Sequence, residues 1–176
     1  MAQWASLFAE QGLGVSKLVG DLLGPCLFAL FMGIGRFCYG RSSENVPLRL
    51  LLLVSSLAAV VCYAVAVFSP FPLVALLGCA FCGLSVSLMW PGTLSYVAAR
   101  MPHGGTALFT CMALGGDAGC SLGPWLTGLV SDVVQAGYNG PNPAQYGLKA
   151  GLITAAVFPV GMFLLLLLFP KQKLEK

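Results

Sequence analysis

Five stretches of this sequence are long and apolar enough to cross a lipid bilayer. A helix needs about 20 predominantly apolar residues to span the hydrocarbon core. Backbone groups cannot go unpaired in lipid, so only helices and closed β-barrels cross it. The stretches lack the two-residue alternation of barrel strands, and the sequence therefore predicts an all-α, polytopic membrane helix bundle. The five stretches are residues 18–39, 48–68, 73–98, 106–133 and 148–169.

The composition excludes an ordinary soluble domain. Hydrophobic residues make up 58% of the chain and charged residues only 9%, whereas a soluble domain carries about 25% charged residues. The net charge of +3 is small, and the basic residues lie mainly near the ends of the stretches. Nucleic acid is therefore not an expected partner, and the lipid bilayer is.

The basic residues predict an orientation in the membrane. With five spans, Lys17 and Lys149 fall on one side and the other seven Lys and Arg residues on the opposite side. Cytoplasmic loops carry the excess of positive charge, so we expect a cytoplasmic C-terminus in a cell (inner or plasma) membrane. The seven are Arg36, Arg41, Arg49, Arg100, Lys171, Lys173 and Lys176.

The first residues form only about half a span. The stretch AQWASLFAEQ resembles the outer end of a helix whose inner half is missing. We therefore expect a fragment, or a chain whose Met1 is an internal methionine of a longer protein. The expected parts are residues 1–17 as the outer end of a truncated helix and a loop, 18–170 as a five-helix bundle, and 171–176 as a basic cytoplasmic tail.

Asp117 lies deep inside the fourth stretch and is the one carboxylate between Gly115 and Gly128. Acids within spans are costly and commonly mark substrate or proton pathways. Asp117 is thus a candidate proton carrier or substrate contact. The alternative is an Asp that only bonds to a neighbouring helix.

Glycines occupy the other side of the same predicted helix. Gly115, Gly119 and Gly123 are spaced by four residues, and at about 100° per residue they lie roughly opposite Asp117. This spacing lets two membrane helices approach closely. We expect the glycines, followed by Pro124, to pack against a neighbour.

Charges also flank the first stretch. Asp21 is either an acid at the helix end, where the helix dipole favours it, or a residue at the mouth of a passage. Arg36 and Arg41 either set the topology or form a latch on a cytoplasmic gate.

The third stretch contains a proline, Pro91, with polar residues around it. Proline interrupts helix hydrogen bonding, and transporters often build binding sites at interrupted helices. Trp90, Ser95 and Tyr96 are therefore candidate cavity residues, although packing is the other explanation for Trp90.

The sequence offers no catalytic set, so we expect no enzyme, no cofactor and no metal site. His103 is the only histidine and lies in a loop, so a serine nucleophile would have no base. Cys79 and Cys82 form C-x-x-C without other ligand types beside them, and we interpret them as small packing residues.

Three stretches together resemble the C-terminal half of a major facilitator superfamily transporter: GIGRFCYGR (33–41), WPGTLSYVAARMPHGG (90–105) and GGDAGCSLGPWLTGLVSD (115–132). Arg36 and Arg41 resemble the basic loop between the eighth and ninth helices of that family. Gly119–Gly128 resembles its glycine-rich eleventh helix. Pro91 resembles the proline of the tenth helix in the fucose and glucose/galactose permease branch.

The resemblance implies a secondary active transporter working by alternating access, with proton coupling as an option. Its partners would be a small-molecule solute and the missing N-terminal half of the same protein. In that family the ninth and twelfth helices are peripheral, which fits the second and fifth stretches, which contain no charge within the membrane. The alternative is a small, self-assembling membrane module without transport activity.

Overall fold

The computed structural model describes residues 2–12, 14, 16–42 and 46–168, and every regular element in these ranges is helical. The expected basic tail, 171–176, lies outside the described residues. Within the described part, four helical stretches are long and apolar enough to cross a membrane. They are Lys17–Arg41, Leu48–Phe68, Pro72–Arg100 and Pro143–Leu168. The prediction of a helical membrane bundle is confirmed at this level.

Three of these stretches are interrupted within their length. The first consists of α2 (Lys17–Asp21), a π-helical turn η2 (Leu22–Cys26) and α3 (Leu27–Ser42), while the second is the continuous helix α4 (Leu48–Phe68). The third divides into α5 (Pro72–Val86) and α6 (Met89–Arg100), and the last into α8 (Pro143–Ala155) and α9 (Val157–Leu168). Before them come α1 (Ala2–Leu7) and the π-helical turn η1 (Phe8–Gly12).

The fourth expected span forms the longest helix, α7 (Gly105–Gly137, 33 residues). It is not among the four apolar stretches, because glycines, hydroxyl residues and the carboxylates Asp117 and Asp132 dilute its apolar side chains. A count of five spans therefore depends on α7.

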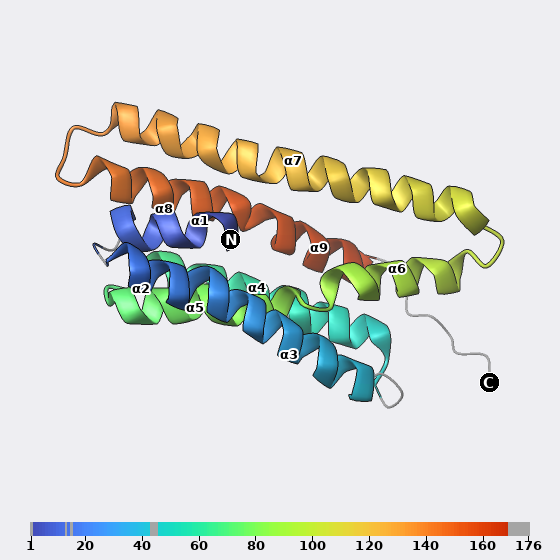
Figure 1. Cartoon of the computed structure of the whole chain (residues 1–176). Coiled ribbons are helices and arrows are strands. Elements are labelled where there is room, and N and C mark those ends of the chain that lie inside the picture. Colours follow the sequence, from blue (N-terminus) through green and yellow to red (C-terminus); the bar gives the residue numbers. More distant parts are fainter. Residues whose placement is uncertain (1, 13, 15, 43–45, 169–176) are drawn as a thin grey trace.

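The helices form an elongated bundle with α7 along one outer side (Figure 1). α8 and α9 lie beside α7 and run in the opposite direction, α2–α5 lie on the far side of them, and α6 extends toward the start of α7. The ends of α3, α6 and α9 and the start of α4 gather at one end of the bundle. The arginines on which the orientation prediction rests lie at the ends of α3 and α6 and at the start of α4.

The largest hydrophobic core lies where the N-terminal helix meets α4, α5 and α8. Cys79 and Cys82 are buried free thiols within it, as their interpretation as packing residues requires. The buried residues of this core are Ala5, Phe8, Tyr63, Ala66, Val67, Ala75, Cys79, Cys82, Leu148, Leu152 and Ala155.

In the second half of the chain, α8 approaches α7 most closely at Gly147 and Gly151, two glycines that the sequence analysis does not include. A Cβ built on Gly147 would lie 2.5 Å from the Ser131 carbonyl oxygen, and one on Gly151 would lie 2.6 Å from that of Thr127. The spacing of these glycines, four residues, is the small-residue pattern of close membrane helix pairs. The pattern was visible in the sequence, and α8 therefore packs tightly on the second half of α7.

The second and fifth spans are more than peripheral supports. α4 is buried along one face, with Leu52, Ala59 and Tyr63 among its buried residues. At the start of α4, the Arg49 guanidinium donates hydrogen bonds to the Leu166 carbonyl oxygen, at 3.1 Å from Nε and 2.7 Å from a terminal nitrogen. A cation at a helix C-terminus satisfies its last carbonyls and its dipole, so Arg49 ties α4 to the end of α9.

Candidate functional site

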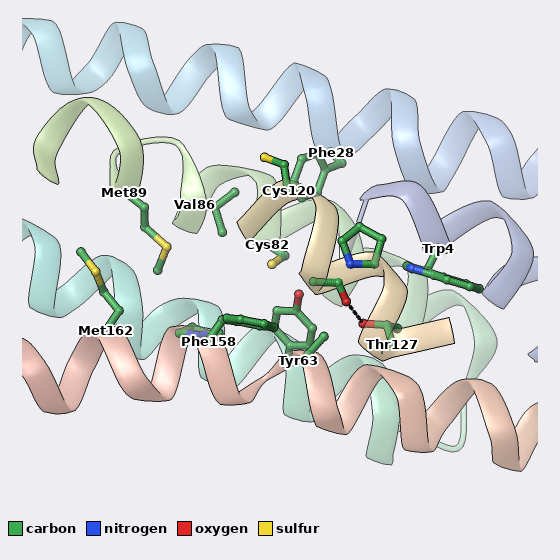
Figure 2. Close-up of a pocket in the computed structure, with 14 residues that line it drawn as sticks. Trp4, Phe28, Tyr63, Cys82, Val86, Met89, Cys120, Thr127, Phe158 and Met162 are labelled. Carbon is green, nitrogen blue, oxygen red and sulfur yellow. Dashed lines mark hydrogen bonds between the residues drawn. The ribbon is translucent and has the colours of Figure 1, made fainter. Parts of the chain in front are cut away.

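A cavity of about 510 Å³ lies in the middle of the bundle (Figure 2). The residues that line it come from α1, α3–α6, the long outer helix α7, α8 and α9. The lining residues are Trp4, Phe28, Tyr63, Cys82, Val86, Met89, Cys120, Gly123, Pro124, Thr127, Ala155, Phe158, Pro159 and Met162.

Helix interruptions surround this cavity. Val86 and Met89 line it on either side of the break between α5 and α6. Ala155 and Phe158 do the same at the break between α8 and α9. Phe28 is the second residue after the π-helical turn η2.

Two prolines in the wall explain part of this geometry. Proline has no N–H and so removes the helix donor for the carbonyl four residues before it. For Pro124 and Pro159 those carbonyls belong to Cys120 and Ala155, and all four residues line the cavity. Irregular backbone at membrane depth is tolerated where it lines a cavity.

The wall is apolar with a few polar groups. The Thr127 hydroxyl donates a hydrogen bond of 2.9 Å to the Gly123 carbonyl oxygen. The Tyr63 hydroxyl points into the cavity in Figure 2. The indole N–H of Trp4 is buried and has no hydrogen-bond partner among the described residues. Charged side chains are absent from the described lining.

The candidates of the third span lie outside this cavity. Trp90 is 46% exposed, and its ring packs at α7, where a Cβ on Gly116 would lie 2.6 Å from it. Ser95 is exposed and Tyr96 is buried. Tyr96 lines a second cavity of about 340 Å³ between α6 and α9, with the Arg100 guanidinium 4.5 Å above its ring centre.

Asp117 is exposed on α7 and is not in the cavity wall. It precedes Pro124 by seven residues, almost two helical turns, so the two residues share one face of α7. The Ser121 hydroxyl bonds to the backbone carbonyl of Asp117, at 3.0 Å, and not to its carboxylate. Asp117 therefore lies on the same face of α7 as Pro124, seven residues earlier and outside the cavity wall, and its role stays a prediction.

The charges of the first span lie at its two ends. Asp21 is half-buried, and its carboxylate accepts a hydrogen bond from the Ser6 hydroxyl, which joins α2 to α1. Arg36 and Arg41 are exposed near the end of α3. Their part in a gate stays a prediction.

The predicted glycine face of α7 divides into two parts. A Cβ on Gly115 or Gly119 would meet nothing within 4 Å, so the neighbour expected there is not among the described residues. Gly123 and Pro124 belong to the cavity wall. The row is thus open at one end and lines the cavity at the other.

Sequence comparison gives one informative similarity. Over 137 residues, 78% of this chain, the sequence is 28% identical to "Membrane protein MosC" of Rhizobium meliloti, and the match covers 33% of that protein's length. No protein-family model matches the chain, and no solved structure matches it. The apolar helices and this similarity identify the chain as a multi-pass helical membrane protein.

Proposed function

We propose that this chain is the C-terminal half of a secondary active transporter, and that the central cavity is one wall of its solute passage. The solute would be a small molecule, moved by alternating access as the two halves rock about the site. This proposal agrees with the resemblance to the major facilitator superfamily described above, and it places α7 in the membrane as a fifth span.

The observation that carries the proposal is the ring of helix interruptions around the cavity. Secondary transporters bind substrate near the bilayer midplane, where discontinuous helices free backbone groups. Here the breaks at Ser87–Leu88 and Ala156 and the proline Pro124 all border the same space. Two spans break here, and a third carries a proline within a continuous helix.

The exposed half of α7 supports the expectation of a missing half. Residues 105–122 of α7 are exposed or half-buried throughout, although they include Asp117. A carboxylate facing lipid is costly, so a further protein segment or a water-filled passage would cover it. The matched relative is about three times as long as the matched segment, which leaves room for such a segment in a protein of that size.

Asp117 provides the test of proton coupling. In the full-length protein, reconstituted in liposomes with a trapped pH-sensitive dye, Asp117→Asn is expected to reduce solute-dependent proton flux by at least about tenfold, equivalent to about 1.4 kcal/mol. The neutral amide keeps the size of the side chain but cannot carry a proton.

Asp132→Asn is the matched control, because Asp132 is also an exposed carboxylate of α7 outside the cavity wall but lies near the end of that helix at Gly137. Its proton flux is expected to equal that of the wild type. Wild-type flux and pH dependence in Asp117→Asn would exclude Asp117 as the proton carrier.

A second candidate function is the self-assembling membrane module. The open face at Gly115 and Gly119 favours it, since helices approach closely along such a row. If this face joins two copies, Gly119→Leu is expected to convert a purified dimer into a monomer in size-exclusion chromatography with light scattering. An unchanged mass after Gly119→Leu would count against this interface.

A further inference from the structure

We propose that the central cavity binds neutral, aromatic or largely apolar solutes that carry a hydrogen-bond acceptor. This inference rests on the proposed transport function and names the class of solute that the wall fits. It differs from the sugars suggested by the permease branch, and the difference follows from the chemistry of the lining.

The wall cannot compensate a charge or many hydroxyl groups. No charged side chain lies in the described lining, and moving an unpaired ion into such a space is strongly unfavourable. The Tyr63 hydroxyl and the carbonyls of Cys120 and Ala155 are too few partners for a sugar. Most of its hydroxyls would stay unpaired, at about 1–3 kcal/mol each. One of the few polar groups, the Thr127 hydroxyl, is already bonded to Gly123.

Aromatic and sulfur-containing side chains provide the contacts instead. Trp4, Tyr63 and Phe158 present ring surfaces to the cavity, and aromatic rings pack on one another at their faces and edges. Met89 and Met162 lie near each other at the end away from Trp4 (Figure 2). Methionine adapts its shape to different ligands, so the wall suits a class of flat apolar molecules.

The volume agrees with a small ring system. About 510 Å³ falls in the range of roughly 300–1,000 Å³ typical of small-molecule sites. A bicyclic aromatic compound fits this space with room left for the opposite wall contributed by the missing half.

The Trp4 indole is the reason why the proposed solute carries a hydrogen-bond acceptor. Its N–H is buried without a partner among the described residues, and Figure 2 shows the nitrogen-bearing edge turned toward the middle of the cavity. A buried donor left unpaired costs about 1–3 kcal/mol. A carbonyl or ring nitrogen on the solute, reached by a small shift of the indole, would remove that cost.

Cysteine alkylation of the wild-type chain tests both the existence of a solute passage and the class of solute that it binds. Cys111 and Cys120 are both exposed on α7, and of these two only Cys120 also lines the cavity. The purified chain in lipid nanodiscs is treated with N-ethylmaleimide, and the modification of each cysteine is followed by peptide mass spectrometry. Coumarin is the neutral bicyclic probe with an acceptor, naphthalene lacks the acceptor, and 1-naphthoate and fucose represent the anionic and the polyhydroxylated classes.

Coumarin is expected to slow alkylation of Cys120 by about tenfold at roughly ten times its Kd, without a change at Cys111. Naphthalene should protect Cys120 more weakly, and 1-naphthoate and fucose should not protect it. Trp4→Phe keeps an aromatic ring of smaller size and removes the N–H, so it should reduce protection by coumarin to the level of naphthalene.

The outcomes separate the two proposals. Suppose that Cys120 reacts in the folded chain without any probe. If fucose or 1-naphthoate then slows the reaction as strongly as coumarin does, the proposed solute class is wrong and the transport proposal still stands. A Cys120 that reacts only after the chain is unfolded overturns both, because a solute passage has to admit water. Equal protection by coumarin in wild type and Trp4→Phe removes the acceptor from the proposed class.

Discussion

Replacing Gly151 with leucine is expected to lower the free energy of unfolding of the chain by about 3 kcal/mol, the upper part of the usual range for overpacking. Even a Cβ at this position would lie 2.6 Å from the Thr127 carbonyl oxygen, and a backbone atom in a helix cannot move aside as a flexible side chain can. The larger side chain would therefore push α8 away from α7. Unfolding in mixed micelles of increasing SDS content, followed by tryptophan fluorescence and circular dichroism, measures the change.

Gly161→Leu is the matched control in the same span. A Cβ on Gly161 would meet nothing within 4 Å, so the same substitution in α9 adds apolar volume without a clash. Its unfolding midpoint is expected to stay within error of the wild type or to rise slightly. Leucine favours the helix more than glycine does, so a loss at Gly161 equal to that at Gly151 would contradict the α7–α8 contact as the cause of the effect.

The glycines also explain which part of the fold could be predicted. Gly115 and Gly119 have the same spacing as Gly147 and Gly151, and a sequence pattern specifies a smooth helix face without specifying its neighbour. Only the second pair packs against a helix among the described residues. Which glycine pair meets a neighbouring helix depends on how the helices are arranged side by side. Short loops restrict this arrangement but do not determine it.

The spans themselves were predictable because hydrophobicity acts locally. Bilayer thickness fixes the length of an apolar run, and the second span was placed at its observed bounds, Leu48–Phe68. The break near Pro91 was also expected from the residue alone. The break at Ala156 lies three residues before Pro159. Residues 150–168 carry no charge, so their pattern predicts only a supporting helix and does not draw attention to the break.

The cavity could not be predicted, because its wall combines residues far apart in the sequence. Trp4 and Met162 have no shared motif, and apolar residues in a membrane span do not reveal whether they face lipid, protein or a passage. The polar candidates Asp117, Trp90 and Tyr96 were selected because polar residues stand out in such a sequence. The described cavity wall is instead mostly apolar.

Filling the cavity with a larger side chain is expected to weaken solute binding. Gly123 lines it, and the nearest atom to a Cβ there is in the Phe158 ring, at 3.9 Å. Gly123→Trp therefore has room to place its indole in the cavity without displacing backbone. We expect coumarin binding to weaken by at least about tenfold, or about 1.4 kcal/mol, measured as loss of its protection of Cys120, while the SDS unfolding midpoint stays close to that of the wild type.

Leu122→Trp is the control for Gly123→Trp, because it adds an indole to the neighbouring residue, which is 53% exposed and outside the cavity wall. Coumarin should protect Cys120 in this variant as in the wild type. If Gly123→Trp binds coumarin normally and is as stable as the wild type, the solute does not occupy this space. If Gly123→Trp instead unfolds at lower SDS, the Phe158 side of the cavity is closed by packing, and α7 and α9 are in direct contact where the passage was proposed.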